Sequence, residues 1–331
     1  MVLSNISALK ADADQALERG RKPREVVAWY AGSTVAIAAV LTLLNILLDY
    51  RMDHTGGLGD MGLRTILATV QAILPMAQVL ALGCLELGYL HAIMRIARKQ
   101  YADRTDLMVG FRKLFPMLRL GLLQGALYCL LLFLSYQVAS AIYMLTPWAD
   151  SLLELMTPFL NSGNMLDLTS LITDAFLAQA MPLVIPMLLL WAVVGCVMII
   201  PVAYRMRMCI FCLLDDPNSR AMAAMRTSVR ITRGNCLKLF RLDLSFWWFY
   251  LVLLLVGMVA YLDVILAMLG IYSGLDPMAF SLLCYGLYLA ATFAATYFLM
   301  NRVQCTYVMA YESICDRPKD NGVVLGNIFQ M

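Results

Sequence analysis

The chain has 331 residues, of which 62% are apolar and only 14% are charged, with a formal net charge of +3. A soluble domain is about 45–50% apolar and about 25% charged, and a single core cannot bury such an excess of apolar side chains. The composition therefore excludes an ordinary soluble domain and predicts an integral membrane protein.

Six runs are long and apolar enough to cross a bilayer, which requires about 20 helical residues. In chain order they cover residues 26–48, 66–94, 120–145, 175–202, 244–271 and 279–300. None alternates polar and apolar residues as the strands of a membrane barrel do, and a helix satisfies its backbone groups within the segment. We predict an all-α polytopic membrane protein with six transmembrane helices at 26–300, amphipathic helices on the cytoplasmic side, an amphipathic N-terminal segment (1–25) and a C-terminal tail (301–331).

Lysine and arginine lie almost entirely on one side of these spans. All but two of the 25 basic residues fall in the N-terminal segment, in the loops after the second and fourth predicted spans, and in the tail. The two exceptions are Arg51 and Arg64, and the acidic loop at 146–174 contains no basic residue. Because cytoplasmic loops carry the excess of basic residues, both termini are predicted to face the cytoplasm.

Residues 207–250 form the least apolar long stretch of the chain and contain a C-x-x-C pair, Cys209 and Cys212. A zinc site or a thiol redox site would need a second pair, a nearby histidine or a βαβ context, and none of these accompanies the pair. We interpret the two cysteines as small apolar residues at the end of a helix, and we expect no metal site. All nine cysteines lie in predicted spans or on the cytoplasmic side, which predicts free thiols rather than disulfides.

Asp215 and Asp216 follow that pair and precede Pro217. Two adjacent carboxylates can bind Mg²⁺ or perform acid–base chemistry. They can also stabilise the positive end of a helix dipole, and Asn218 or Ser219 would then cap the helix that follows. We favour the capping interpretation.

The helix predicted over 220–233 carries a basic stripe. Arg226, Arg230 and Arg233 recur at i, i+4 and i+7, and Gly234 follows as a stop signal. Such a helix suits the inner membrane surface, where each basic residue near an anionic leaflet contributes about 1 kcal/mol. The same arginines would also suit a phosphorylated ligand or a protein partner. The aromatic run at 246–250 lies where the fifth span begins, at the depth of an aromatic belt.

This region resembles a family of bacterial integral membrane proteins, known mainly from Firmicutes, that is catalogued as domain of unknown function 975. The residues that carry the resemblance are an I-P step and a tyrosine at the end of one span, a D-x-P motif, three small residues along an amphipathic helix, and an L-x-L-S-F-x-W motif: Ile200, Pro201, Tyr204, Asp215, Pro217, Ala224, Ser228, Gly234 and residues 242–248. The segment "ELGYLHAIMRIARKQYADRTDLMVGF" resembles the family's first cytoplasmic segment. The resemblance implies a multi-pass topology in the bacterial cytoplasmic membrane and supplies no activity.

Three ionisable residues lie inside predicted spans, and such residues are functional hypotheses by default. Glu86 and His91 belong to the second span, and Asp263 belongs to the fifth. At 1.5 Å per residue, Glu86 lies about 30 Å from the outer end of its span, near the inner interface, where His91 and Arg95 can join it. By the same count Asp263 lies near the outer interface. A proton or cation relay is therefore one interpretation of this intramembrane polar set.

Two short patterns concern helix packing and repetition. "GFRKLF" from Gly110 and "GNCLKLF" from Gly234 each precede a span that enters from the cytoplasm, which is compatible with a repeated hairpin or with two similar amphipathic lead-ins. Gly121 and Gly125 form a G-x-x-x-G pattern, which allows two helices to approach closely.

The sequence contains no H-E-x-x-H, G-x-S-x-G or phosphate-binding glycine loop. We therefore expect a non-enzymatic protein without a cofactor, whose partners are membrane lipid and other membrane proteins or a second copy of itself, and not nucleic acid. The alternative is a small transporter or permease component that uses the intramembrane polar residues.

Overall fold

The computed structural model describes residues 6–18, 22–54, 61–161, 174–216, 220–268 and 277–315. Every regular element in these ranges is a helix. Five of the described helices are long and apolar enough to cross a membrane, and a sixth span results if one bent pair of helices is counted as a unit. The predicted class, an all-α polytopic membrane protein, is confirmed.

The long helices correspond to five of the six predicted spans, and each begins before the predicted first residue. They are α2 (Lys22–His54), α3 (Met61–Ala97), α5 (Leu114–Tyr143), α8 (Asp174–Met206) and α14 (Pro277–Ala295). α14 continues through a π-helical turn, η5 (Thr296–Met300), directly into α15 (Asn301–Ile314). Residues 301–314, which the sequence assigned to the C-terminal tail, are therefore helical, and Val303, Cys305 and Val308 are buried among them.

The fifth predicted span, 244–271, is divided. α11 (Cys236–Leu244) and α12 (Trp247–Ala260) meet at an angle of 58°, and α13 (Leu262–Met268) follows. The bend lies at Ser245 and Phe246, where the Ser245 hydroxyl donates to the carbonyl of Leu242. The long apolar helix of this run therefore begins at Trp247, after α11 has taken a different direction.

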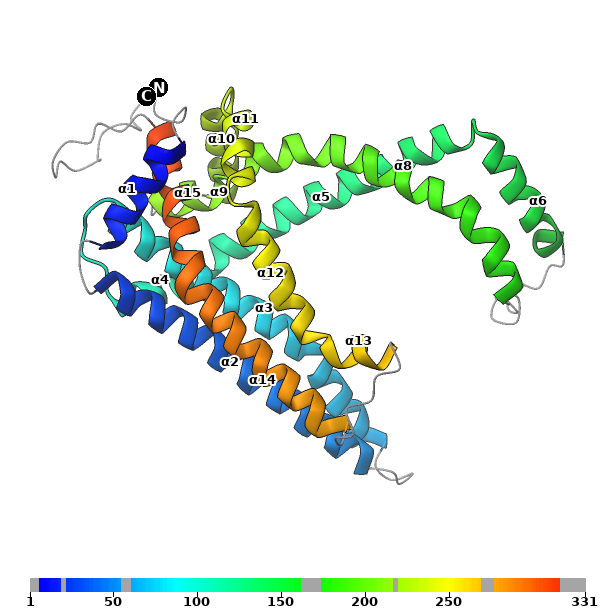
Figure 1. The fold of residues 1–331 in the computed structure, drawn as a ribbon, viewed down its shortest axis with the longest axis horizontal. Helices are drawn as coiled ribbons and strands as arrows, with labels where there is room; N and C mark the ends of the chain where they lie inside the picture. Colours follow the sequence, from blue (N-terminus) through cyan, green and yellow to red (C-terminus); the bar gives the residue numbers. More distant parts are fainter. Residues whose placement is uncertain are drawn as a thin grey trace.

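The long helices form two limbs that diverge from a common end (Figure 1). α5 and α8 make one limb, with α6 (Pro147–Asn161) at its far end, and α2, α3, α12 and α14 make the other. Polar contacts tie helices within each limb. Thr42 and Tyr285 share a hydrogen bond of 2.6 Å between α2 and α14, and Trp191 Nε1 donates to Ser135 Oγ at 3.1 Å between α8 and α5.

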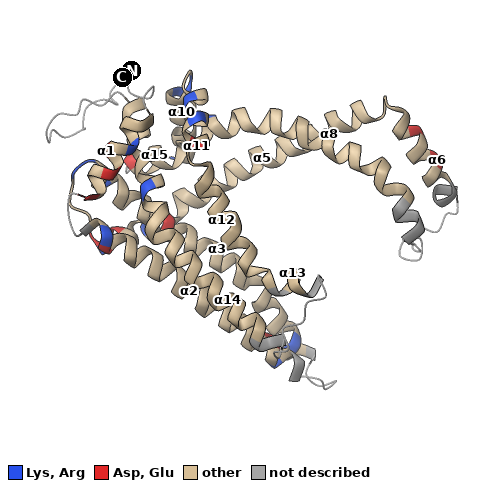
Figure 2. Cartoon of the chain, in the orientation of Figure 1, with Lys and Arg blue, Asp and Glu red and all other residues tan. Residues whose placement is uncertain are grey.

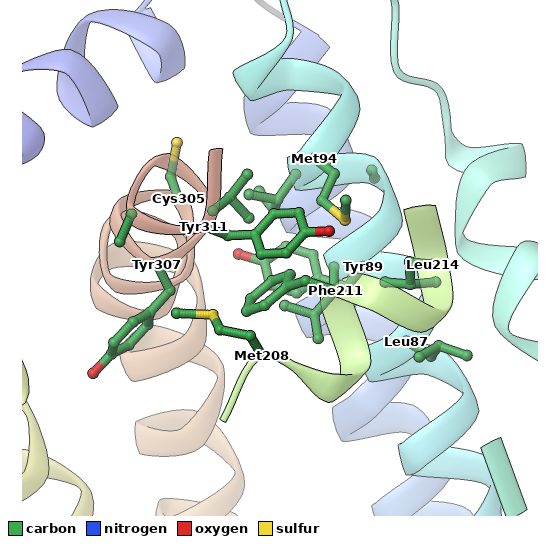
Figure 3. Packing of buried hydrophobic residues seen from close by; sticks show 14 of the residues in the cluster. Leu87, Tyr89, Met94, Met208, Phe211, Leu214, Cys305, Tyr307 and Tyr311 are labelled. Atoms are coloured by element: carbon green, nitrogen blue, oxygen red, sulfur yellow. The ribbon is translucent and has the colours of Figure 1, made fainter. Parts of the chain in front are cut away.

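The hydrophobic core lies at the common end and not along the limbs. It is built by α1 (Ile6–Glu18), η3 (Arg104–Met108), α9 (Cys209–Asp215), α10 (Ala221–Thr232) and α11, together with α15 and one end of α3. Figure 3 shows part of this core, in which Tyr89 from α3, Phe211 from α9 and Tyr311 from α15 pack together. The short segments that the sequence placed separately on the membrane surface therefore form one packed unit, here called the core unit.

Two glycines allow α3 to lie against η3 and α4 (Val109–Arg112) in backbone contact. A Cβ atom at Gly88 would lie 2.0 Å from the carbonyl oxygen of Leu107, and one at Gly110 would lie 1.8 Å from that of Cys84. At Gly121 and Gly125 a Cβ atom would meet nothing within 4 Å. The close approach predicted for the G-x-x-x-G pattern is therefore absent from the described part of the chain, and two glycines outside that pattern provide one elsewhere.

The N-terminal helix α1 docks at the bend between α11 and α12. The Lys10 ammonium donates to the carbonyl of Ser245 at 3.0 Å and lies 4.2 Å from the centre of the Phe246 ring. Arg302 on α15 pairs with Asp14 at 2.6 Å. Burial is the main cause that lowers the pKa of Lys10 from its ordinary value, and the neighbouring Arg302 lowers it further. α1 is thus a structural part of the core unit rather than a separate surface helix.

Candidate functional site

Two residues of the predicted basic stripe lie on the outer face of α10, and the third, Arg233, follows the last residue of that helix in a non-helical conformation. Arg226, Arg230 and Arg233 are all exposed, and we call them the arginine stripe. The opposite face of the helix is buried in the core unit through Ala221, Ala224, Met225, Ser228 and Thr232. Because packing uses one face of α10 only, the stripe remains accessible to a ligand.

Hydroxyl groups on the buried face fix α10 to the end of α8. Ser228 Oγ and Thr232 Oγ1 donate to the carbonyl oxygen of Arg205, at 2.8 and 3.2 Å, in the last turn of α8. That carbonyl would otherwise lack a partner within its helix. α10 ends at Thr232, and Gly234 adopts a positive φ of 82°, which confirms its predicted role as a stop signal.

The distribution of charge follows the two-limb architecture. Figure 2 shows lysine and arginine on α10 and elsewhere at the core end, while most of the length of α5 and α8 carries no charged residue. The arginine stripe therefore lies where the α5–α8 limb joins the core unit, next to the exposed apolar surface of the long helices.

A polar cluster joins α8 to α11, α12 and α15, and we call it the Asp243 cluster. The Asp243 carboxylate accepts from the guanidinium of Arg207 at 3.0 Å and from the Tyr204 hydroxyl at 2.7 Å. It also accepts from the Tyr307 hydroxyl, and the Tyr250 and Tyr307 hydroxyls lie 3.0 Å apart. The guanidinium carbon of Arg207 lies 4.8 Å from the centre of the Tyr307 ring. The carboxylate is thus fully supplied with donors, as a poorly hydrated charge requires.

A second network, around Arg98, ties the end of α3 to α9 and α15. The Arg98 guanidinium contacts Asp215 at 2.7 Å and Glu312 at 2.6 Å, and the Tyr311 hydroxyl donates to Asp215 at 3.0 Å. The predicted caps Asn218 and Ser219 lie outside the described residues, and the helix-start role favoured for Asp215 is wrong, because Asp215 is the last residue of α9. Its carboxylate sits in an ion-pair network, and the N-cap of α10 is Arg220, which makes no side-chain capping bond.

The end of α9 is stabilised by a lysine from the start of α5. Lys113 Nζ donates to the carbonyls of Leu213 and Leu214, at 3.2 and 3.3 Å, in the last turn of that helix. A cation at this position also interacts favourably with the helix dipole. Burial lowers the pKa of Lys113 and outweighs the opposing effect of the nearby Asp216.

The intramembrane polar residues do not share one face. Glu86 is exposed on α3, whereas His91, five residues later, is half buried. That separation turns the second side chain by about 140° around the helix axis at 3.6 residues per turn. Arg95, which was expected to join them, pairs instead with Asp106 of η3 at 2.6 Å. Asp263 belongs to α13, but its side chain lies outside the described part of the structure.

Cys209 and Cys212 are buried in the core unit as apolar residues, and they lie in the separate short helix α9 rather than at the end of α8. The residues described contain no group of three or more His, Cys, Asp or Glu side chains positioned to hold a metal ion. The polar groups that the structure does bring together are the Asp243 cluster and the Arg98 network, and the sequence reading missed both. The isolated acid Asp243 next to an apolar span was the available signal.

Comparison with known proteins gives no relative from which a function could be transferred. The chain matches no family model, no curated protein and no solved structure. The class of the molecule, a multi-pass helical membrane protein, therefore rests on its own spans and fold.

Proposed function

We propose that the chain is a non-enzymatic multi-pass protein of the bacterial cytoplasmic membrane that contacts anionic lipid headgroups through the arginine stripe. In this proposal the core unit and both termini face the cytoplasm. The excess of basic residues at that end and the resemblance to the family of domain of unknown function 975 support this orientation and location.

One observation carries the proposal. Arg226 and Arg230 are exposed on a helix whose opposite face is fixed to the core unit and to the end of α8, and Arg233 is exposed directly after that helix ends. The packing of α10 does not require these arginines, and exposed guanidinium groups are well suited to bind phosphate. Their position beside the start of two apolar limbs favours the phosphates of a bilayer over those of a dissolved ligand.

The test compares lipids that remain bound to the detergent-solubilised full chain, measured by native mass spectrometry. The triple variant Arg226→Gln, Arg230→Gln, Arg233→Gln should bind phosphatidylglycerol more than about tenfold more weakly, because each basic residue contributes about 1 kcal/mol near an anionic surface. Its binding of phosphatidylcholine should be unchanged.

The control Arg51→Gln, Arg64→Gln removes charge from the opposite end of the molecule and should bind phosphatidylglycerol like the parent chain. Equal phosphatidylglycerol binding by the parent chain and the triple variant would refute the lipid-contacting role of the stripe.

Transport is a second candidate function, and the divergence of the two limbs from a shared end favours it (Figure 1). Two groups of spans joined at one end resemble the moving halves that an alternating-access transporter requires. Proton flux into proteoliposomes, followed with a pH-sensitive dye, would test it. The parent chain should then conduct protons faster than empty liposomes, and Glu86→Gln should lose that flux. Flux no higher than in empty liposomes would exclude proton transport.

A further inference from the structure

Two segments that lead into a span expose the same side-chain pattern. Residues 108–118 lead into α5, and residues 237–247 lead into α12. In each segment four large apolar side chains recur at i, i+3, i+7 and i+10, and we call these sets the lead-in rows: Met108, Phe111, Phe115 and Leu118 in the first, and Leu237, Phe240, Leu244 and Trp247 in the second. The exposed fractions are 39–72% in the first row and 44–64% in the second.

Each row also has an exposed arginine at i+4, Arg112 in the first and Arg241 in the second. In this register Phe111 corresponds to Phe240, so that both rows contain a Phe-Arg pair. The K-L-F similarity in the sequence matched Phe115 with Phe240 instead, one helical turn away. The pattern of exposed side chains therefore aligns Phe111 with Phe240, whereas sequence similarity aligns Phe115 with Phe240.

The face opposite each row is buried in the core unit. Leu107 and Gly110 are buried behind the first row, and Leu239, Leu242 and Phe246 are buried behind the second. Each lead-in is thus held in place on one side while its other side exposes a strip of four apolar residues. The first strip runs through η3, α4 and the start of α5, and the second crosses the bend between α11 and α12. Exposed apolar residues that are scattered singly need no explanation, but the same spacing of four such residues in two segments indicates an interaction surface.

The strips continue into exposed apolar surfaces of α5 and α12. Beyond the first row, Leu122 is exposed on α5, and beyond the second, Leu251 and Leu254 are exposed on α12. Arginine beside an apolar strip can extend its guanidinium to the headgroups while its aliphatic part stays among acyl chains. The tryptophan at the end of the second row suits the same depth.

From this continuity and charge we propose that the two lead-in rows are paired interfacial anchors in the leaflet next to the core unit. Their apolar side chains lie among the acyl chains of anionic phospholipids, and Arg112 and Arg241 contact the phosphates. The inference deepens the proposed lipid-contacting function and rests on it for the identity of the leaflet, but it names a surface separate from the arginine stripe.

The experiment uses the full chain in nanodiscs of phosphatidylglycerol and phosphatidylcholine. The photo-crosslinker p-benzoylphenylalanine replaces Phe111, Phe115 or Phe240 one at a time, which keeps an aromatic side chain at each position. The matched control places it at Asp12, an exposed polar residue of α1 in the same core unit. The three row positions should give about tenfold or more lipid adduct relative to Asp12, since burying one large apolar side chain is worth at least that factor.

A second arm tests the two arginines. In the double variant Arg112→Gln, Arg241→Gln, the ratio of phosphatidylglycerol to phosphatidylcholine in the adducts should fall to the ratio in the nanodisc. Adducts between two copies of the chain in place of lipid adducts, or lipid yields equal to that at Asp12, would overturn the proposal.

The arginine-stripe triple variant separates this inference from the proposed function. It should leave the row adducts intact. If the adducts form but the stripe does not affect lipid binding, the anchors stand and the function of the stripe fails. If the stripe variant weakens lipid binding but no lipid adducts form at the rows, the anchor proposal alone is rejected.

Discussion

The guanidinium of Arg207 lies 3.0 Å from the carboxylate of Asp243, across the junction of the two limbs. Arg207 directly follows α8, the last helix of one limb, and Asp243 lies in α11, which leads into α12 of the other. Tyr204 and Tyr307 complete the donors around the carboxylate. The position of one limb relative to the other is therefore set in part by an ion pair whose carboxylate has low exposure.

Asp243→Asn should destabilise the fold by about 2 kcal/mol. Removing one member of a fully buried ion pair costs about 3–5 kcal/mol. The expected value here is smaller because the Arg207 side chain is 37% exposed to solvent. Unfolding of the detergent-solubilised chain, titrated with a denaturing detergent, measures the change. Arg207→Gln should cost a similar amount, and the double variant should cost less than the sum of the two.

Asp150→Asn provides the control, because Asp150 is an exposed carboxylate on α6 at the far end of the α5–α8 limb. Its unfolding should match that of the parent chain. Additive losses in the Asp243–Arg207 double variant would show that the pair is not energetically coupled.

Arg98→Gln should loosen α15 from the core unit. The Arg98 guanidinium bridges Asp215 on α9 and Glu312 on α15. Its loss leaves two carboxylates facing each other without a cation between them. Hydrogen bonds to charged groups are each worth about 1.5–3 kcal/mol, so the local opening free energy of α15 should fall by about 2 kcal/mol. Hydrogen exchange of residues 301–314 measures it.

The Glu312→Gln variant separates charge from contact, since it keeps an oxygen acceptor and removes one negative charge. It should loosen α15 less than Arg98→Gln does. Unchanged exchange of residues 301–314 in Arg98→Gln would contradict a role of this network in docking α15.

The sequence predicted the elements that depend on residues close together in the chain. Apolar runs located the spans, and periodicity over 220–233 located the arginine stripe and its stop at Gly234. The core unit was not predictable in this way, because its polar contacts join positions far apart in the chain, such as Arg98 and Glu312, separated by 214 residues. Asp215 illustrates the limit. An acid before a helix is an equally good cap or ion-pair partner, and a distant arginine decides between the two roles.

Lys99→Gly should stabilise the chain by about 1 kcal/mol. Lys99 has a positive φ of 60° at the end of α3, where its N–H donates to Ile96 and the next N–H, of Gln100, donates to Arg95. This bonding pattern is the Schellman motif, which glycine normally occupies because a side chain costs about 1–2 kcal/mol in the left-handed region. A higher melting temperature of the Lys99→Gly variant would show that this backbone strain has been removed. The control Gln100→Gly, at an ordinary φ, should lower the melting temperature, and a decrease in both variants would contradict the interpretation.

Gly110→Ala should be the most damaging single-methyl change among these variants. The added Cβ atom would lie 1.8 Å from the carbonyl oxygen of Cys84 and 2.9 Å from the amide nitrogen of Gly88, and backbone atoms within two packed helices cannot move aside as a flexible side chain can. Overpacking costs about 1–3 kcal/mol and occasionally more, and we expect about 3 kcal/mol in the denaturing-detergent titration.

Gly121→Ala is the matched control, because a Cβ atom there meets nothing within 4 Å and alanine favours a helix by about 1 kcal/mol over glycine. It should unfold like the parent chain or later. A harmless Gly110→Ala would mean that α3 and α4 do not touch through their backbones, and the lead-in row that begins at Met108 would then lose the support that holds it against the core unit.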